Sequence, residues 1–158
     1  EEAAQARAAF ERQFAQWEAE VGWRQLEAPR KLWAVSDLHV ESAENLAWIN
    51  SLPDVLADDA LVVAGDVCTE LSALRGALTV LVSRFKHVFY IVGNHELWLT
   101  PQDTSDGLTD SLDKFAAILE LVTAVGAHAA PTMLGDDPSG LLLLPLHSWY
   151  HADFLSAE

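Results

Sequence analysis

The sequence predicts an α/β fold built on a parallel β-sheet. Between residues 31 and 92, three short apolar runs of strand length alternate with two segments of helical periodicity, and this alternation implies parallel strands joined by right-handed crossovers. Polar residues that can bind a metal or a phosphate follow each run directly, in the order Asp37-x-His39, Gly65-Asp66 and Gly93-Asn94-His95-Glu96. Because ligands bind beyond the carboxyl ends of such strands, we predict that the three motifs form one site.

Composition and charge narrow the class of protein. The chain has 158 residues, of which 51% are hydrophobic, so it can bury the core of one domain. Its formal net charge of −15 disfavours nucleic acid and anionic membranes as partners, because both require a basic surface. A nuclease is disfavoured for the same reason. Cys68 is the only cysteine, which excludes an intrachain disulfide, and we expect a soluble intracellular protein.

Residues 1–26 are predicted to form an N-terminal segment built on an amphipathic helix. Its large apolar residues recur at i, i+4, i+7 and i+11 and form one stripe: Phe10, Phe14, Trp17 and Val21. We expect this stripe to dock on the domain formed by residues 30–158, and a helix that binds a partner is the alternative.

The remaining elements follow from periodicity and from stop signals. Apolar runs predict strands at residues 31–35, 60–64 and 87–92, and helical spacing predicts helices at 43–51, 69–84 and 110–124. The polar stretch 100–109 is predicted to be a loop at the rim of the site. A short strand at 127–130 is expected to precede a hairpin that pairs 132–134 with 141–146 across a turn rich in Gly and Asp.

The side chains at the strand ends form a donor set for a divalent metal. Asp37, His39, Asp66 and Asn94 supply two carboxylates, an imidazole and an amide oxygen, which suit Mn, Fe, Zn or Mg and differ from the thiolates of a structural zinc site. Because a carboxylate has two oxygens, one Asp of this set can bridge two metal ions, as carboxylates do in two-metal hydrolases. A bridging hydroxide could then attack a phosphoester.

The two residues after Asn94 are assigned to the reaction and its support. If Asn94 points at a metal, His95 points elsewhere, and its imidazole is placed to stabilise transition-state charge or to protonate the leaving oxygen. Glu96 has two interpretations. It either orients His95 or is an acidic residue that favours a helix start.

Together the three motifs resemble the first three motifs of the calcineurin-like metallophosphoesterases. The resemblance covers residues 32–96 and extends more loosely to 143–151. It implies a metallophosphoesterase-like β-sandwich flanked by helices, with two divalent metal ions between strand ends. One ion would be held by Asp37, His39 and Asp66, and the other by Asp66 and Asn94. The implied substrate is a phosphorylated small molecule or a phosphoprotein.

The sequence departs from the family pattern after Glu96. The family completes its metal shells with three later histidines, two of them in a Gly-His-x-His motif, which this sequence lacks. The histidines that follow are His128, His147 and His151, and the last two could in principle approach the site. We therefore expect the chain to be C-terminally incomplete. The alternative is a non-catalytic binding or scaffold module, or an inactive fragment of the same fold.

Overall fold

The computed structural model describes residues 24–136 and 139–148, together with the single positions 5, 8, 12 and 15. The apolar stripe predicted for the N-terminal helix lies outside these residues, and so does His151. The division of the chain into residues 1–26 and 30–158 therefore stays a prediction. Among the described residues, no helix has both the length and the apolar character needed to cross a bilayer.

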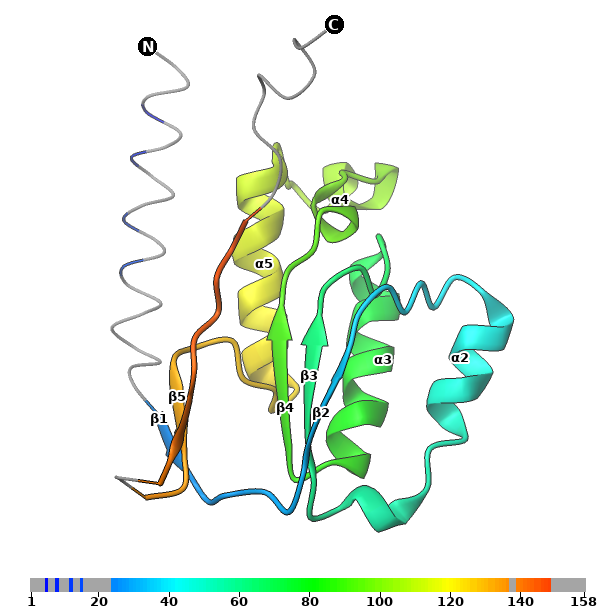
Figure 1. Cartoon of the computed structure of the whole chain (residues 1–158). Helices are drawn as coiled ribbons and strands as arrows, with labels where there is room; N and C mark the ends of the chain where they lie inside the picture. Colours follow the sequence, from blue (N-terminus) through cyan, green and yellow to red (C-terminus); the bar gives the residue numbers. More distant parts are fainter. Residues whose placement is uncertain are drawn as a thin grey trace, which may run out of the picture.

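The described part of the chain forms two three-stranded sheets with four α-helices (Figure 1). The α/β class is confirmed. The strands are β1 Arg24–Leu26, β2 Leu32–Val35, β3 Ala60–Ala64, β4 His87–Ile91, β5 Thr132–Leu134 and β6 Leu141–Leu143. The helices are α2 Ala43–Asn50, α3 Leu71–Arg84, α4 Pro101–Ser105 and α5 Ser111–Ala124, with 3-10 turns η1 Asp54–Leu56 and η2 His95–Leu97.

The first sheet brings the three motifs to one edge. Strands β2, β3 and β4 pair in parallel in that order, as the crossover pattern predicts. The central strand β3 is the apolar run Ala-Leu-Val-Val-Ala, and such a run suits a parallel strand that is covered on both faces. β2 is an edge strand, and its Leu32 and Trp33 are exposed. All three strands end at the same side of the sheet, where the polar motifs begin.

Helices α3 and α5 form the main core with this sheet. In α3 the buried residues recur at i, i+3, i+4 and i+7: Leu74, Ala77, Leu78 and Leu81. The carboxylate of Asp110 caps α5 by accepting hydrogen bonds from the N–H groups of Leu112 and Asp113. Val63, Leu78 and Ile118 are fully buried where the layers meet, and burying each such side chain contributes about 1.5–3 kcal/mol.

The second sheet joins distant parts of the sequence. β5 and β6 form the predicted antiparallel hairpin, and β1 pairs with β5 in parallel. We did not predict β1, because three residues show no periodicity and their partner lies about a hundred residues away. The predicted strand at 127–130 is wrong: only an isolated bridge joins Phe89 to His128. A small cluster of Ala60, Phe89 and Leu134 packs between the two sheets.

The predicted loop at 100–109 is also wrong in its first half. Thr100 and Asp103 form a capping box, in which the Thr100 hydroxyl accepts the Asp103 N–H and the Asp103 carboxylate accepts the Thr100 N–H. Pro101 occupies the first helical position, which favours a helix start. The resulting helix α4 lies beyond the carboxyl ends of β3 and β4 (Figure 1).

Candidate metal centre

Backbone hydrogen bonds hold the loops after β2 and β3 against each other. The N–H of Asp37 donates to the carbonyl of Gly65 at 3.2 Å, and the N–H of His39 donates to the carbonyl of Asp66 at 3.1 Å. The parallel pairing of the strands therefore continues past their ends, and the first two motifs form one rigid platform.

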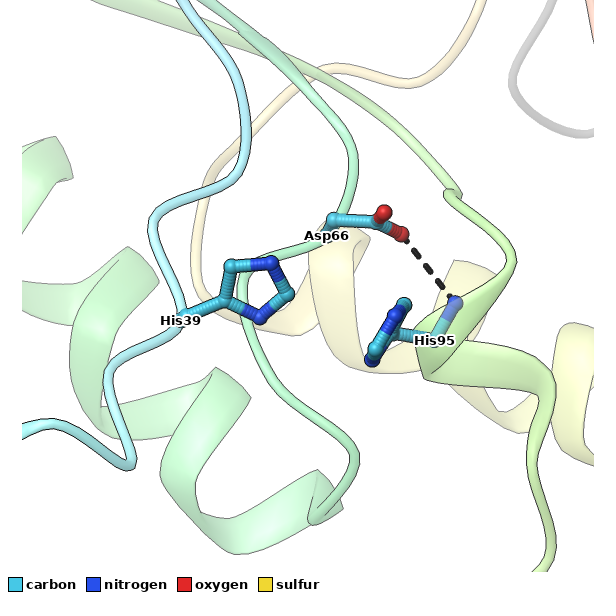
Figure 2. A group of neighbouring side chains, drawn as sticks. All are labelled: His39, Asp66 and His95. Atoms are coloured by element: carbon cyan, nitrogen blue, oxygen red, sulfur yellow. Dashed lines mark hydrogen bonds between the residues drawn. The ribbon is translucent and has the colours of Figure 1, made fainter.

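Three potential metal ligands converge on this platform. One ligand atom each from His39, Asp66 and His95 lies within 4.8 Å of the other two, and all three residues are half-buried (Figure 2). The rings of His39 and His95 are 4.9 Å apart and nearly perpendicular. The carboxylate of Asp66 also accepts the backbone N–H of His95 at 3.1 Å, which fixes the start of η2 beside the second motif. Two imidazoles and a carboxylate are ligands that divalent transition metals favour.

The same region contains the strained backbone of the described chain. Asp37, His39 and Asp66 adopt positive φ values of 55°, 39° and 54°. Asp and His are among the residues that tolerate this conformation best, yet each such residue still costs about 1–3 kcal/mol, and such strain clusters at functional sites. The donor types, their spacing and the strain together fit a bound divalent cation.

Two glycines allow the loops to approach this closely. A Cβ on Gly65 would lie 2.7 Å from the Cα and 2.8 Å from the nitrogen of Gly93. A Cβ on Gly93 would collide with the carboxylate and the backbone nitrogen of Asp66. Gly65 also has a φ of +80°, which a side chain would strain further. Alanine at Gly65 would displace the backbone of Gly93, and alanine at Gly93 would displace Asp66.

Glu96 supports the backbone of the site. Its buried carboxylate accepts hydrogen bonds from four N–H groups: Asp66 at 3.0 Å, Val67 at 2.5 Å, Cys68 at 3.3 Å and Gly93 at 2.9 Å. Neither sequence interpretation of Glu96 described this arrangement, because three of the four partners come from the loop after β3, 28 to 30 residues earlier in the chain. One side chain therefore binds the second and third motifs together.

Cys68 lies beside this support and is chemically protected. Its thiol is buried, and burial, together with the negative charges of Glu41 and Glu96, raises its pKa to about 12. Because the thiolate is the reactive form, burial and the raised pKa disfavour Cys68 as a nucleophile.

A buried lysine completes the support, and sequence reasoning missed it. The Nζ atom of Lys114 lies 2.6 Å from the carboxylate of Asp103 and donates hydrogen bonds to the carbonyls of Thr69 and Trp98 at 2.8 and 2.5 Å. Thr69 follows the second motif and Trp98 follows the third. The available signal was the spacing of Lys114 with Ile118 and Leu121, which places it on the buried face of α5.

The remaining predicted residues have distinct positions. Asp37 shares a loop with His39 but is not part of the three-residue cluster, and Asn94 immediately precedes η2, next to His95. The ring of His147 packs edge-on against Phe115 of α5, and burial lowers its pKa. The ligand and catalytic roles assigned from the sequence stay predictions.

His128 lies beside the middle of β4 rather than at the strand ends. Its backbone bridges to Phe89, and its ring is hydrogen bonded to Arg24 at 2.9 Å. Burial, followed by the charges of Arg24 and His87, lowers its pKa to about 4. These contacts give His128 a structural role in joining the two sheets.

Comparison with known proteins identifies a family and a similarity to PptH of Mycobacterium tuberculosis, both in sequence and in structure. The sequence model of the calcineurin-like phosphoesterases matches residues 30–150. The [acyl-carrier-protein] phosphodiesterase PptH of Mycobacterium tuberculosis is 44% identical over 72 residues, which are 46% of this chain and 22% of that protein. The crystal structure of the phosphopantetheinyl hydrolase PptH from the same organism matches with a TM-score of 0.64 and 29% identity, covering 77% of this chain and 44% of that chain. The chain thus spans less than half the length of the relatives it matches.

Proposed function

The chain belongs to the calcineurin-like phosphoesterase family, and on that premise we propose that it hydrolyses a phosphoester with the help of divalent metal ions. The family predicted from the three motifs is confirmed by the match over residues 30–150. The observation that carries the proposal is the convergence of His39, Asp66 and His95, whose ligand atoms lie within 4.8 Å of one another at the carboxyl ends of parallel strands.

We assign the metal-binding roles as the sequence predicts them. Asp37, His39 and Asp66 would hold one ion, and Asp66 and Asn94 would hold the second, in a dinuclear centre. Such ions would polarise a phosphoester and would supply, from a water shared between them, a hydroxide nucleophile near neutral pH. The positive φ values of the first three of these residues support the assignment, because strain of this kind is kept where function requires it.

The protein's own groups prepare the geometry of the reaction. The carboxylate of Asp66 fixes the backbone of His95 by accepting its N–H, and Glu96 fixes the backbone of Asp66 in turn. His95 is placed to stabilise charge on the phosphoryl group or to give a proton to the leaving oxygen. Its ring lies beside that of His39, which supports a role next to the bound phosphoester.

The relatives support a phosphodiester as the substrate class. PptH is named as a phosphodiesterase that acts on acyl carrier protein. We therefore propose that this protein cleaves a phosphodiester that links an organic group to a protein or to a small molecule. The formal net charge of −15 argues against nucleic acid as that substrate.

The test uses the full-length protein, stripped of metal and reconstituted with Mn²⁺. We expect Mn²⁺-dependent hydrolysis of bis(para-nitrophenyl) phosphate, reduced at least about a hundredfold by Asp66→Asn and by Asn94→Ala, since each removes a ligand. Asp136→Asn, in the exposed turn between β5 and β6, is the matched control and should keep wild-type activity. Full activity in both ligand variants would overturn the proposal.

A Mn²⁺ titration by calorimetry tests the dinuclear centre separately. The wild-type protein should bind two ions, and Asp66→Asn should weaken both, because the carboxylate is shared. Binding of a single ion by the wild-type protein would contradict the dinuclear assignment while leaving metal-dependent hydrolysis open to its own test.

A further inference from the structure

An exposed tryptophan lies directly against the candidate metal centre. The ring centroids of Trp98 and His95 are 4.0 Å apart, and the planes are tilted by 35°. The Trp98 side chain is nevertheless 54% exposed, and the neighbouring Leu99 is 40% exposed. An exposed apolar surface formed by Trp98 and Leu99 therefore adjoins the cluster of His39, Asp66 and His95 through the contact between Trp98 and His95.

The backbone of Trp98 is held by buried groups. Its carbonyl accepts a hydrogen bond from the fully buried Nζ of Lys114 at 2.5 Å, and its N–H donates to the carbonyl of His95 at 3.2 Å. Lys114 is in turn paired with the buried Asp103 at 2.6 Å. The exposed indole is thus attached to a fixed backbone, so a ligand that packs against it pays little conformational entropy for ordering this segment.

Position and chemistry together indicate what this surface contacts. A phosphoester that reaches His39, Asp66 and His95 carries its organic group outward from the phosphate, and Trp98 borders that path because its ring touches His95. An indole offers a flat apolar face that favours aromatic and other planar groups. Ligand sites combine such apolar walls with a few polar groups that orient the ligand.

We propose that Trp98 is a specificity-determining residue, whose indole packs against a planar or apolar part of the organic group esterified to the substrate phosphate. This inference rests on the proposed phosphoesterase function, and it adds the substrate feature that the site selects. Lys114 is a positioning residue for this contact, because it holds the Trp98 carbonyl without touching the substrate path.

The test compares two phosphonates that resist hydrolysis and differ in aromatic area. Benzylphosphonate and naphthylmethylphosphonate are titrated by calorimetry into the Mn²⁺-loaded full-length protein. We expect the wild-type protein to bind the naphthyl compound about tenfold more tightly, which is the range of an aromatic contact. Trp98→Ala should remove this preference, and Trp98→Phe should retain part of it. Trp48→Ala is the matched control, because Trp48 on α2 is similarly exposed.

The outcomes separate this inference from the proposed function. An unchanged naphthyl preference in Trp98→Ala overturns the inference even if the protein hydrolyses phosphoesters. Equal weakening of both phosphonates together with weaker Mn²⁺ binding also overturns it, because Trp98 would then only support His95. A Trp98-dependent preference in a protein that hydrolyses no phosphoester supports the contact and rejects the catalytic proposal. With an active protein, the KM for a naphthyl ester should rise in Trp98→Ala about tenfold while kcat stays nearly constant.

Discussion

The two ends of the parallel sheet each bury a carboxylate, and they use it differently. Asp59, just before β3, is buried and receives hydrogen bonds from the half-exposed Arg30 at 2.8 Å and from the indole of Trp33 at 2.8 Å. At the other end, Asp103 pairs with a lysine that has no exposed surface. The first carboxylate ties neighbouring segments of the sheet, whereas the second anchors a lysine that reaches two functional loops.

The difference shows which end of the sheet is built for chemistry. At the amino end, the bonds of Asp59 run to residues of the first strand region, and the backbone there has ordinary φ values. At the carboxyl end, buried charges coexist with three non-glycine residues at positive φ. Strain persists only where the surroundings determine the conformation, and here Glu96 holds the backbone of Asp66, whose carbonyl in turn accepts the N–H of His39.

The largest loss of stability is expected from Lys114→Met. The substitution leaves the buried carboxylate of Asp103 without its cation, with only the hydrogen bonds from Thr100, and breaking a buried ion pair typically costs about 3–5 kcal/mol in the free energy of unfolding. Urea titration measures this loss. The double variant Lys114→Met/Asp103→Leu should recover much of the stability, because no buried charge is left. A single variant within about 1 kcal/mol of wild type, a typical error for such titrations, would show that the pair is not coupled to folding.

A smaller loss of stability and a large loss of metal affinity are expected from Glu96→Gln. The substitution keeps the shape but replaces a charged acceptor of four N–H groups, so stability should fall by about 1–3 kcal/mol. Mn²⁺ affinity should fall about 10- to 100-fold, as for other groups that orient ligands. Calorimetry measures both effects beside Glu120→Gln, an exposed position on α5 that should match wild type.

Asp59→Asn tests the amino end of the sheet and should leave the site untouched. We expect a smaller loss of stability than for Lys114→Met, because Arg30 is half-exposed and can turn to water. The affinity for Mn²⁺ should equal that of wild type in the same calorimetric titration. A loss of Mn²⁺ affinity comparable to that expected for Glu96→Gln would show that the two ends of the parallel sheet are coupled, which would contradict the difference described above.

The smallest expected effect is a change in acid sensitivity. Hydrogen bonds from Arg30 and then Trp33 lower the pKa of Asp59. Burial raises the pKa of Asp103, but hydrogen bonds from Lys114 and Thr100 outweigh it, so the pKa lies below its ordinary value of 3.8. A lowered folded-state pKa means that each contribution is present above pH 3.8 and is lost as the pH falls through the lowered value.

Urea unfolding at a series of acidic pH values measures this dependence. Asp103→Asn should flatten the acid side of the stability profile relative to wild type, because the carboxylate that binds a proton there is gone. Thr109 hydrogen bonds also lower the pKa of Asp113, so Asp113→Asn gives a comparison at a half-buried position in the first turn of α5. Identical acid profiles for wild type and Asp103→Asn would contradict the predicted contribution.

The parts of the fold that the sequence predicts are those with local signals. The strand ends at Val35, Ala64 and Ile91 follow from apolar runs that stop at polar motifs, and α5 follows from its Asp110 cap. The helix α4 was missed although its capping box lies in the sequence, because the polar composition of residues 100–109 was given more weight. β1 was missed because only its pairing with β5 makes it a strand.

The residues of the candidate site also fall into those with a local sequence signal and those without one. Residues that belong to short motifs, such as His39, Asp66 and His95, were identified in the sequence, and the structure brings them together. The supporting contacts that join distant segments were not identified. No local sequence signal indicates that Glu96 and Lys114 contact residues about thirty and forty-five positions away. Long-range support of this kind emerges only from the packed structure.

The burial of Cys68 makes the supporting layer observable by simple kinetics. A thiol with a pKa of about 12 in a closed environment reacts with a disulfide reagent only when its surroundings open. Because the chain has a single cysteine and its N–H is bound by Glu96, the labelling rate of the native protein reports how often this layer opens. The labelling rate of Cys68 therefore measures how often the loops that hold the proposed ligands open, and added Mn²⁺ should lower that rate.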